Sequence, residues 1–538
     1  MKKLPIIVIV LFCNQLSSVY GQADYWQQQV DVKIDVTLND KEHALDGFIR
    51  MDYHNNSPDT LYYLWFHLWP NAYKHDRTAF SDQLLENGRT EFYFSNNDKR
   101  GYINRLDFKV GGVVAMTEDH PQHQDITRLI LPQPLPPKST TSIQTPFHVQ
   151  LPFNFSRGGH IGQSYQVTQW FPKPAVYDRK GWHPMPYLHQ GEFYGEFGNY
   201  EVQITLPENY VVAATGDLQD QEEQVWLKKK IRKPADCYDC RGKKKQRIAG
   251  SETVSSGKTK TIHFKQEDIH DFAWFADKDF IIYYDSLQLP GGKKINLYSY
   301  HLPKTTNEDY WARSTQFIKN TILTRSNWLG SYPYNTVSVV EAVMGLPGGM
   351  EYPTITSIYP VDSESSLERV IGHEVGHNWN YGILGSNERE HPWMDEGIDT
   401  YYDNRYRKSE NFTPTENPHG PAFFAKRIPQ DLSPLGFNIM ASNKRDQPAE
   451  TASENFSEIN YGLSAYYKTG EWVKLIENKL GTALFDSCMH AYYRRWKFKH
   501  PYPEDFIKVL QDVSGENMDE IACFLKGAPA SCPRKKRF

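Results

Sequence analysis

The stretch "HEVGHNWNYGILGSNEREHPWMDEG", residues 373–397, holds two histidines four residues apart, with a glutamate next to the first. The segment around it, "LERVIGHEVGHNWNY" at 367–381, has no proline and suits a helix, on which positions i and i+4 share one face. His373 and His377 can therefore offer two imidazoles to one ion, with Glu374 beside them as a general base.

A third ligand follows downstream. Glu396 opens a second helical stretch, "MDEGIDTYYDNRY", and two nitrogens plus one carboxylate leave a fourth position for water, as in catalytic zinc sites. Zinc lowers the pKa of bound water from ~16 to about 7, and Glu374 would accept its proton and pass it to the leaving amine. The alternative is a pair of surface histidines and a glutamate favoured by a helix N-terminus.

Each imidazole also needs an acceptor that fixes its tautomer, and Thr400 or Asp399, one turn beyond Glu396, is predicted for this role. Zinc is the expected metal, at one ion per chain. The ligand set by itself does not exclude cobalt or manganese.

The rest of the chain indicates several domains. At 538 residues it is too long for one core, and two to four domains are expected. Alternating apolar residues in "VDVKIDVTL" and "YEVQITLP" predict an antiparallel β domain over 22–286. Helical spacing then predicts a mostly helical catalytic domain over 287–480 and a short helical region over 481–538. The expected helices cover "NEDYWARSTQFIKNTILTRSNWLG" and residues 365–382, 394–408, 462–480 and 502–526.

Two polar segments interrupt these patterns. A basic one runs from "KKKIRKP" at Lys228 to "GKKKQR" at Gly242 and is interpreted as a solvated hairpin extension or, alternatively, an anionic docking loop. A second, at about 409–458, is rich in Pro, Asn and Ser and is typical of a functional cover or a disordered segment.

The N-terminus indicates export. Lys2 and Lys3 precede the apolar run "LPIIVIVLF", which predicts a signal peptide over 1–21 and no membrane anchor after its cleavage. The mature protein is expected in the periplasm, outside the cell or at the envelope. Cys13 leaves lipidation as an alternative. The net charge of -5 argues against nucleic acid as a partner.

Five cysteines follow the predicted signal peptide, and an odd number leaves at least one free thiol. Cys237 and Cys240 form "CYDC" without a second pair at zinc-ribbon spacing, which favours a local disulfide or two thiols over a metal site. Cys523 and Cys532 can bridge near the C-terminus.

The sequence resembles the aminopeptidase N family of gluzincin zinc peptidases, in its bacterial members with a short C-terminal region. Besides the histidine motif, "GGMEY" at 348–352 is similar to the family's Gly-x-Met-Glu-Asn, and "WMDEG" at 393–397 to its Trp-x-x-Glu-Gly. "LWFHLWPNAY" at 64–73 and "DFAWFA" at 271–276 extend the likeness to the β region. The resemblance implies an α+β multidomain fold, with a saddle-like N-terminal β domain and a thermolysin-like catalytic domain.

The resemblance also assigns residues. It implies that Glu351 binds the α-amine of the substrate, and that Gly348, Gly349 and Met350 form a strand pairing with the substrate backbone. A tyrosine that stabilises the oxyanion stands in a Tyr-x-Lys-Gly setting in the family. Tyr466 fits Tyr-x-Lys here, and Tyr467 is the alternative if Gly470 is the matching glycine.

Departures from the family concern the pocket. Tyr352 stands where the family has asparagine, and "HNWNYG" replaces His-Gln-Trp-Phe-Gly. The family uses a glutamine of the β domain at the amine site, and Gln163 is the candidate by register.

These features together predict an exported zinc aminopeptidase that acts on peptides with a free N-terminus. The alternatives are an endopeptidase or specialised peptidase on the same fold, and a non-catalytic binding module that retained the fold. Glu351 discriminates between the first two, because its charge would select substrates with a free amine.

Overall fold

The structure, a computed structural model, describes residues 25–232, 253–303, 308–342, 348–361, 363–409 and 432–527. The predicted signal peptide, Cys13, Cys237, Cys240 and Cys532 lie outside these residues, as do 233–252 of the basic segment and 410–431 of the polar stretch. Cys523 is disulfide-bonded, and Cys488 is a buried free thiol. None of the described helices is both long and apolar enough to cross a membrane.

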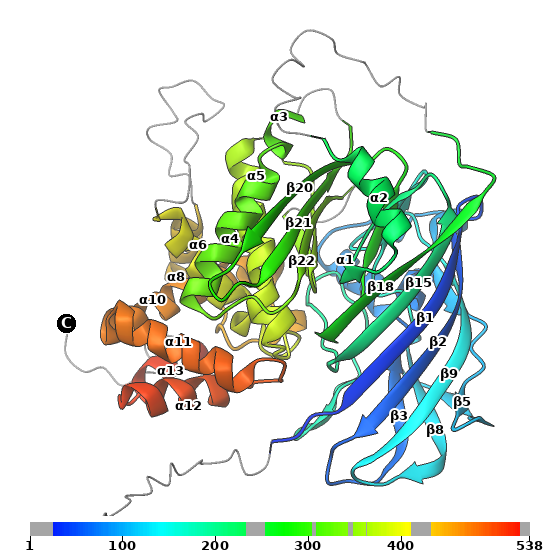
Figure 1. The fold of residues 1–538 in the computed structure, drawn as a ribbon. Coiled ribbons are helices and arrows are strands. Elements are labelled where there is room, and N and C mark those ends of the chain that lie inside the picture. The colour runs from blue at the N-terminus through cyan, green and yellow to red at the C-terminus, as the bar shows by residue number, and fades with distance from the viewer. Residues whose placement is uncertain are drawn as a thin grey trace, which may run out of the picture.

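The N-terminal part is built on a nine-stranded sheet with the order β17-β18-β15-β1-β2-β9-β5-β6, with β4 also on β9. In β1 (Gln29–Asn39) buried and exposed residues alternate, so one face of the sheet packs inward. Figure 1 shows this sheet curving along one side of the molecule. The sheet is antiparallel as predicted except for one parallel pair, β1 with β15 (Gly198–Pro207). Its other strands are β2 (Ala44–Asn55), β4 (Tyr102–Asn104), β5 (Lys109–Val110), β6 (Val113–Val114), β9 (Ser139–Gln150), β17 (Asp217–Leu218) and β18 (Thr259–Ile269).

Three smaller sheets complete this part, in the orders β10-β11-β19-β16, β12-β3-β8-β7 and β13-β14. Their strands are β3 (Leu61–His67), β7 (Thr117–Asp119), β8 (Ile126–Leu135), β10 (Gly159–Ile161), β11 (Ser164–Val167), β12 (Lys173–Pro174), β13 (Tyr177–Asp178), β14 (Gly181–Trp182), β16 (Val211–Ala214) and β19 (Trp274–Asp277). Helices α1 (Ala79–Glu86) and α2 (Gln221–Lys230) connect strands of this part.

The C-terminal part begins with a five-stranded sheet of order β20-β21-β22-β24-β23. Its first strand, β20 (Ile281–Gln288), contains the predicted boundary at 286/287, so the change of architecture comes before Ile281. β23 (Gly349–Tyr352) is the edge strand and leaves one side of its backbone unpaired within the sheet. The remaining strands are β21 (Lys294–His301), β22 (Thr336–Glu341) and β24 (Ile355–Ile358).

Helices pack beside this sheet and follow it to the C-terminus (Figure 1). Helix α5 (Glu364–His377) begins at Ser363, whose side chain caps it by accepting a hydrogen bond from the Ser366 amide. Helix α11 (Thr482–Trp496) lies between two of the individually predicted helices, inside the region 481–538 that was predicted to be helical. The other helices are α3 (Glu308–Trp311), α4 (Ser314–Trp328), α6 (Glu396–Arg407), α8 (Ser433–Ser442), α9 (Glu458–Asn460), α10 (Thr469–Leu480), α12 (Pro503–Ser514) and α13 (Asp519–Lys526). Two π-helical segments, Asn378–Ile383 and Tyr461–Lys468, adjoin α5 and α10.

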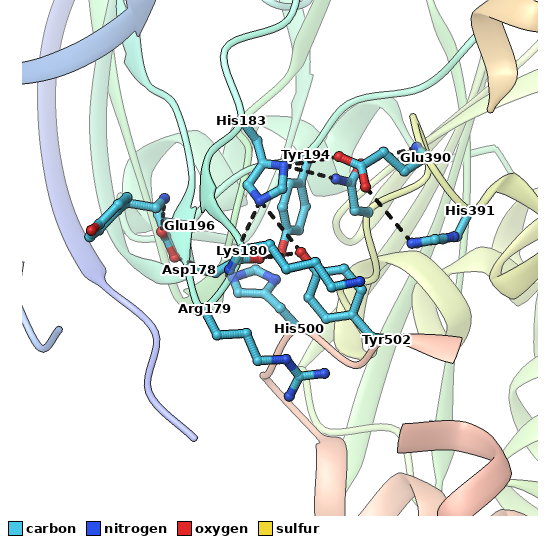
Figure 2. A network of polar contacts seen from close by, with 12 residues as sticks. Asp178, Arg179, Lys180, His183, Tyr194, Glu196, Glu390, His391, His500 and Tyr502 are labelled. Carbon is cyan, nitrogen blue, oxygen red and sulfur yellow. Dashed lines mark hydrogen bonds and ion pairs between the residues drawn. The ribbon is translucent and has the colours of Figure 1, made fainter. Parts of the chain in front are cut away.

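A buried polar network joins the β part, the segment before the zinc-ligand candidate Glu396, and the C-terminal helices (Figure 2). The Asp178 carboxylate lies 2.9 Å from His183 Nε2 and accepts a 2.6 Å hydrogen bond from the Tyr502 hydroxyl. His183 Nδ1 lies 3.1 Å from Glu390 Oε1. Three segments that are distant in sequence are thereby held around one imidazole.

This network predicts a pH-dependent stability. Burial opposes protonation of His183, but Asp178 and Glu390 outweigh it and raise the pKa of His183 to about 9. Because the unfolded chain has an ordinary histidine pKa of about 6.5, the contribution is complete below that pH and disappears as the pH rises through about 9. Thermal unfolding of the wild type and of His183→Gln between pH 5.5 and 9.5 is expected to show a difference in Tm that shrinks with rising pH. A difference that is independent of pH would contradict this interpretation.

Candidate active site

Three donor atoms from two helices converge at one point. His373 and His377, one turn apart on α5, bring their Nε2 atoms to 3.2 Å. Oε2 of Glu396, the first residue of α6, lies 3.5 Å from Nε2 of His373 and 3.3 Å from Nε2 of His377. Two imidazole nitrogens and one carboxylate oxygen thus lie within 3.5 Å of one another, which fits the protein ligands of one divalent cation.

Carboxylates hold the remote nitrogens of both histidines. Nδ1 of His377 lies 2.6 Å from Asp395, and Nδ1 of His373 lies 2.7 Å from Asp403 and 3.2 Å from Asp399. A proton on each Nδ1 leaves the Nε2 lone pairs directed at the common point, which is the arrangement that metal ligation needs. The prediction of Asp399 is thus partly right in position, but Asp403 is nearer and Asp395 was missed. Thr400 makes no bond to either histidine among the described residues.

A buried arginine balances this carboxylate pair. Arg325 of α4 lies 3.1 Å from Asp399 and 2.8 Å from Asp403. This contact could not be predicted from the sequence, because Arg325 and Asp399 are 74 residues apart along the chain and belong to different helices. The spacing of Glu396, Asp399 and Asp403 on one helical face was the available signal for the two aspartates.

The electrostatics of the site favour a bound cation. Burial opposes charge on His373 and His377, yet Asp403 and Asp395 hold the pKa of each well above its usual range. Burial also works against ionised Glu396, but the two histidines keep its pKa well below the ordinary value. A metal ion would replace the protons on the imidazoles, so its binding is expected to weaken in acid.

Glu374 points into the same space. Burial raises the pKa of Glu374 to about 8, against the pull of His373 and His377, and its Oε2 atom has no hydrogen-bond partner among the described residues. Strand β23 passes close to it: a Cβ at Gly349 would lie 2.4 Å from Glu374 Cδ. Gly348, at φ +107°, has a backbone conformation that favours glycine, so both glycines allow the edge strand to reach the base.

Glu351 shares a cavity with these groups. The cavity, of about 290 Å³, contains Glu351, Glu374, Glu396 and both histidines in its wall. Burial raises the pKa of Glu351 well above its ordinary value, and its Oε1 atom has no hydrogen-bond partner among the described residues. A buried carboxylate whose oxygen accepts no hydrogen bond needs either a proton or a neighbouring cation to offset its charge. The ammonium group of a substrate would be such a cation.

Six residues of the β part also line this cavity, and none of them was predicted from the sequence: Asn87, Arg89, Arg157, His189, Gln190 and Glu192. The guanidinium of Arg157 donates to both carboxylate oxygens of Glu192, at 2.6 and 3.0 Å. Gln190 donates to the backbone carbonyls of Ser453 and Phe456, which ties the β part to the helical part next to the cavity.

The structure does not bring Gln163 to this cavity, and that prediction is wrong. Its amide donates to the Asp40 carbonyl at 2.9 Å, and its Oε1 accepts from Ser255 at 3.3 Å. Gln163 was chosen by counting residues along its own segment. The residues of the β part that do line the cavity include Gln190 and Glu192, which lie on a different loop that this count could not identify.

The two tyrosine candidates face different directions. The hydroxyl of Tyr466 donates to Glu396, and its ring lies 6.1 Å from that of His373. Tyr467 instead packs at 6.0 Å against Phe437 and does not line the catalytic cavity. The π-helical turn over Tyr461–Lys468 sets these directions, and such turns are frequent at functional sites.

Comparisons with known proteins agree with this geometry. Residues 332–524 match the Peptidase family M1 domain. The chain is 21% identical over 286 residues to Aminopeptidase M1-C of Oryza sativa subsp. japonica, covering 50% of this chain and 31% of that protein. It is 25% identical over 203 residues to Leucine aminopeptidase 2 of Lodderomyces elongisporus, covering 32% and 30%. The matches thus span about a third of these relatives.

Solved structures show the same fold over nearly the whole chain. An M1 zinc metallopeptidase from Deinococcus radiodurans superimposes with a TM-score of 0.57 at 15% identity, covering 94% of this chain and 93% of that one. Aminopeptidase A of Legionella pneumophila, in complex with aspartic acid, gives 0.60 at 11% identity and covers 94% and 50%.

The fold combines an N-terminal β part with a mostly helical C-terminal part, and the three converging donor atoms form the kind of site that holds a divalent cation in zinc metallopeptidases of the gluzincin class. Residues 332–524, which include all three donor residues, match the Peptidase family M1 domain, and the fold of nearly the whole chain is similar to that of solved M1 zinc metallopeptidases.

Proposed function

We propose that this protein is a zinc aminopeptidase that removes the N-terminal residue of peptides. The observation that carries the proposal is one cavity in which three metal-donor atoms, the base Glu374 and the amine-binding candidate Glu351 meet. His373, His377 and Glu396 would hold one Zn²⁺ per chain. When bound, the ion would act as a Lewis acid and make water a better nucleophile at neutral pH.

The chain's own residues would carry out the remaining work. Glu374 accepts the proton of the attacking water and delivers it to the leaving nitrogen, for which its buried position beside the histidines is suited. The Tyr466 hydroxyl, which here donates to Glu396, would donate to the developing oxyanion. The unpaired edge of β23 would align the substrate backbone by strand addition.

Glu351 would select for a free N-terminus. It lies on β23 and lines the same cavity as Glu374 and the metal-donor residues, so an ammonium bound there would place the first peptide bond next to them. Glu192 adds a second carboxylate to the same wall. A solved structure of a mutant M1 zinc metallopeptidase from Deinococcus radiodurans carries a bound Tyr-Ser-Ala substrate, which supports a peptide substrate here.

The test is a panel of aminoacyl-coumarins and N-acetylated counterparts, assayed with and without a chelator. We expect activity on the free-amine substrates only, its loss with chelator, and its return with zinc. Glu351→Gln is expected to lower kcat/KM for free-amine substrates by about 10²- to 10³-fold, since it leaves a buried ammonium without its partner. Equal cleavage of acetylated substrates would favour an endopeptidase, and stoichiometric metal without any hydrolysis would favour a binding module.

We further propose that the protein is exported. The support is the sequence of residues 1–21, with two lysines before an apolar run and small residues after it. Edman sequencing of protein recovered from the envelope and medium would locate the mature N-terminus, and one at Met1 would contradict export by cleavage.

A further inference from the structure

A second cavity adjoins the catalytic one. It measures about 480 Å³ and shares Gly348, His373, Glu374 and Tyr466 with the catalytic cavity, but Glu351 does not line it. The proposed amine site, Glu351, lies in the first cavity. The second cavity therefore extends from Glu374 and His373 on the side away from Glu351. If the proposed function holds, this is the side of the scissile bond that carries the leaving group.

Two arginines line this second cavity, one on each metal-binding helix. Arg369 precedes His373 by one turn on α5, and Arg407 follows Asp403 by one turn on α6. Asp403 itself contacts the His373 ring at 2.7 Å. The backbone of each arginine therefore lies about 6 Å along its helix axis from the level of the His373 ring.

The two helices run in opposite directions, which brings the arginines to nearby levels along the helix axes. Near the metal site, Glu396 at the start of α6 faces His377 at the end of α5. Further along, the Tyr406 hydroxyl donates to Glu368 at 2.9 Å. Arg369 lies one residue from Glu368 toward the metal site, and Arg407 lies one residue beyond Tyr406 away from it. The two arginines therefore start within about 3 Å of the same level along the helix axes.

Both arginines have unused hydrogen-bonding capacity. They are exposed, and no acidic side chain of the described residues forms an ion pair with either. Among the described residues, Arg407 donates a hydrogen bond to Asn404, on its own helix. Arg405, on the same helix, shows the contrast, because its guanidinium is paired with Asp486 at 2.8 Å. Two guanidinium groups on a cavity wall form a site for a carboxylate.

We propose that Arg369 and Arg407 bind a carboxylate of the leaving peptide, so that the protein prefers short peptides whose C-terminal carboxylate reaches this pair. The arginines start one helical turn from the metal-ligand level, and their side chains extend further into the cavity. A leaving group of about two residues, at 3.3–3.6 Å each, would span the distance from the metal site to their guanidinium groups. Tripeptides with a free carboxylate are thus the preferred substrates. An Asp or Glu side chain of the leaving peptide offers the same chemistry, and the inference rests on the proposed function.

The experiment compares kcat/KM for Ala-Ala-Ala, Ala-Ala-Ala-amide, Ala-Asp-Ala-amide and alanyl-coumarin. For the wild type we expect kcat/KM for Ala-Ala-Ala to exceed that for Ala-Ala-Ala-amide by about tenfold. This ratio should fall in high salt, because the two arginines are exposed and salt screens their charge. In the double variant Arg369→Gln/Arg407→Gln this preference should vanish, while alanyl-coumarin and the amide keep their rates. Lys408→Gln is the matched control, because it removes the same charge beside Arg407 but does not line the cavity.

The outcomes separate this inference from the proposed function. No hydrolysis of alanyl-coumarin by the zinc-loaded wild type would overturn the proposed function. Hydrolysis without a preference for the free carboxylate, or a preference that survives in the double variant, would overturn the carboxylate site alone. A preference for Ala-Asp-Ala-amide over Ala-Ala-Ala-amide, with none for the C-terminal carboxylate, would assign the arginines to acidic side chains and overturn the preference for tripeptides.

Discussion

Glu374→Gln is expected to abolish peptide hydrolysis while the purified protein keeps its zinc. The amide cannot accept the proton of the attacking water or return one to the leaving nitrogen, and such proton transfers contribute about 10²- to 10⁴-fold to a rate. Gln nearly preserves the size of the side chain, which matters because Gly349 approaches Glu374 so closely. Metal content by mass spectrometry and kcat on an aminoacyl-coumarin are the two measurements.

Glu368→Gln is the matched control for this substitution. Glu368 lies on the same helix and is equally buried, but it faces Tyr406 rather than the cavity. An amide oxygen can still accept the hydrogen bond from Tyr406, so activity is expected to stay close to that of the wild type. Full turnover by Glu374→Gln, with zinc retained, would remove Glu374 from the role of base.

Tyr466→Phe is expected to lower kcat by about 10²- to 10³-fold, the scale for losing one donor to an oxyanion. KM should change little, because the hydroxyl would contact the developing charge rather than the ground-state peptide. The ring of Tyr466 remains beside His373 in the variant, so zinc binding is expected to persist.

Tyr467→Phe tests the alternative. Its ring packs on Phe437 and its side chain lines only the neighbouring cavity, so we expect kcat to fall by less than about tenfold. A large loss in Tyr467→Phe together with an unaffected Tyr466→Phe would transfer the oxyanion role to Tyr467.

Several features of the site followed from local sequence alone. The four-residue spacing of His373 and His377 places both rings on one helix face, whatever surrounds the helix. The period-two alternation in β1 likewise predicts a sheet with one inward face. The choice of Tyr466 was also possible, although its reason lay in the family's motif and not in any local rule.

Other features depended on long-range packing. The domain boundary was predicted too late, because β20 has the same strand pattern whether it pairs with the β part or with β21. The bounds of helix α11 were not predicted within the helical region 481–538, although the helix ends in buried aromatic residues that pack against its neighbours. Gln163 was placed by counting along one strand, and counting cannot show which loop of the β part reaches the cavity.

The sequence by itself determined the class of the fold and the shared helix face of His373 and His377, since these depend on repeats within single helices and strands. Only the tertiary structure decided that Glu192 and Arg157 line one cavity with Glu351, that Arg325 pairs with the aspartates, and that Arg369 and Arg407 lie at nearby levels on antiparallel helices. The physical reason is that a repeat fixes where a side chain points around its own axis, whereas the partner it meets depends on how separate elements pack.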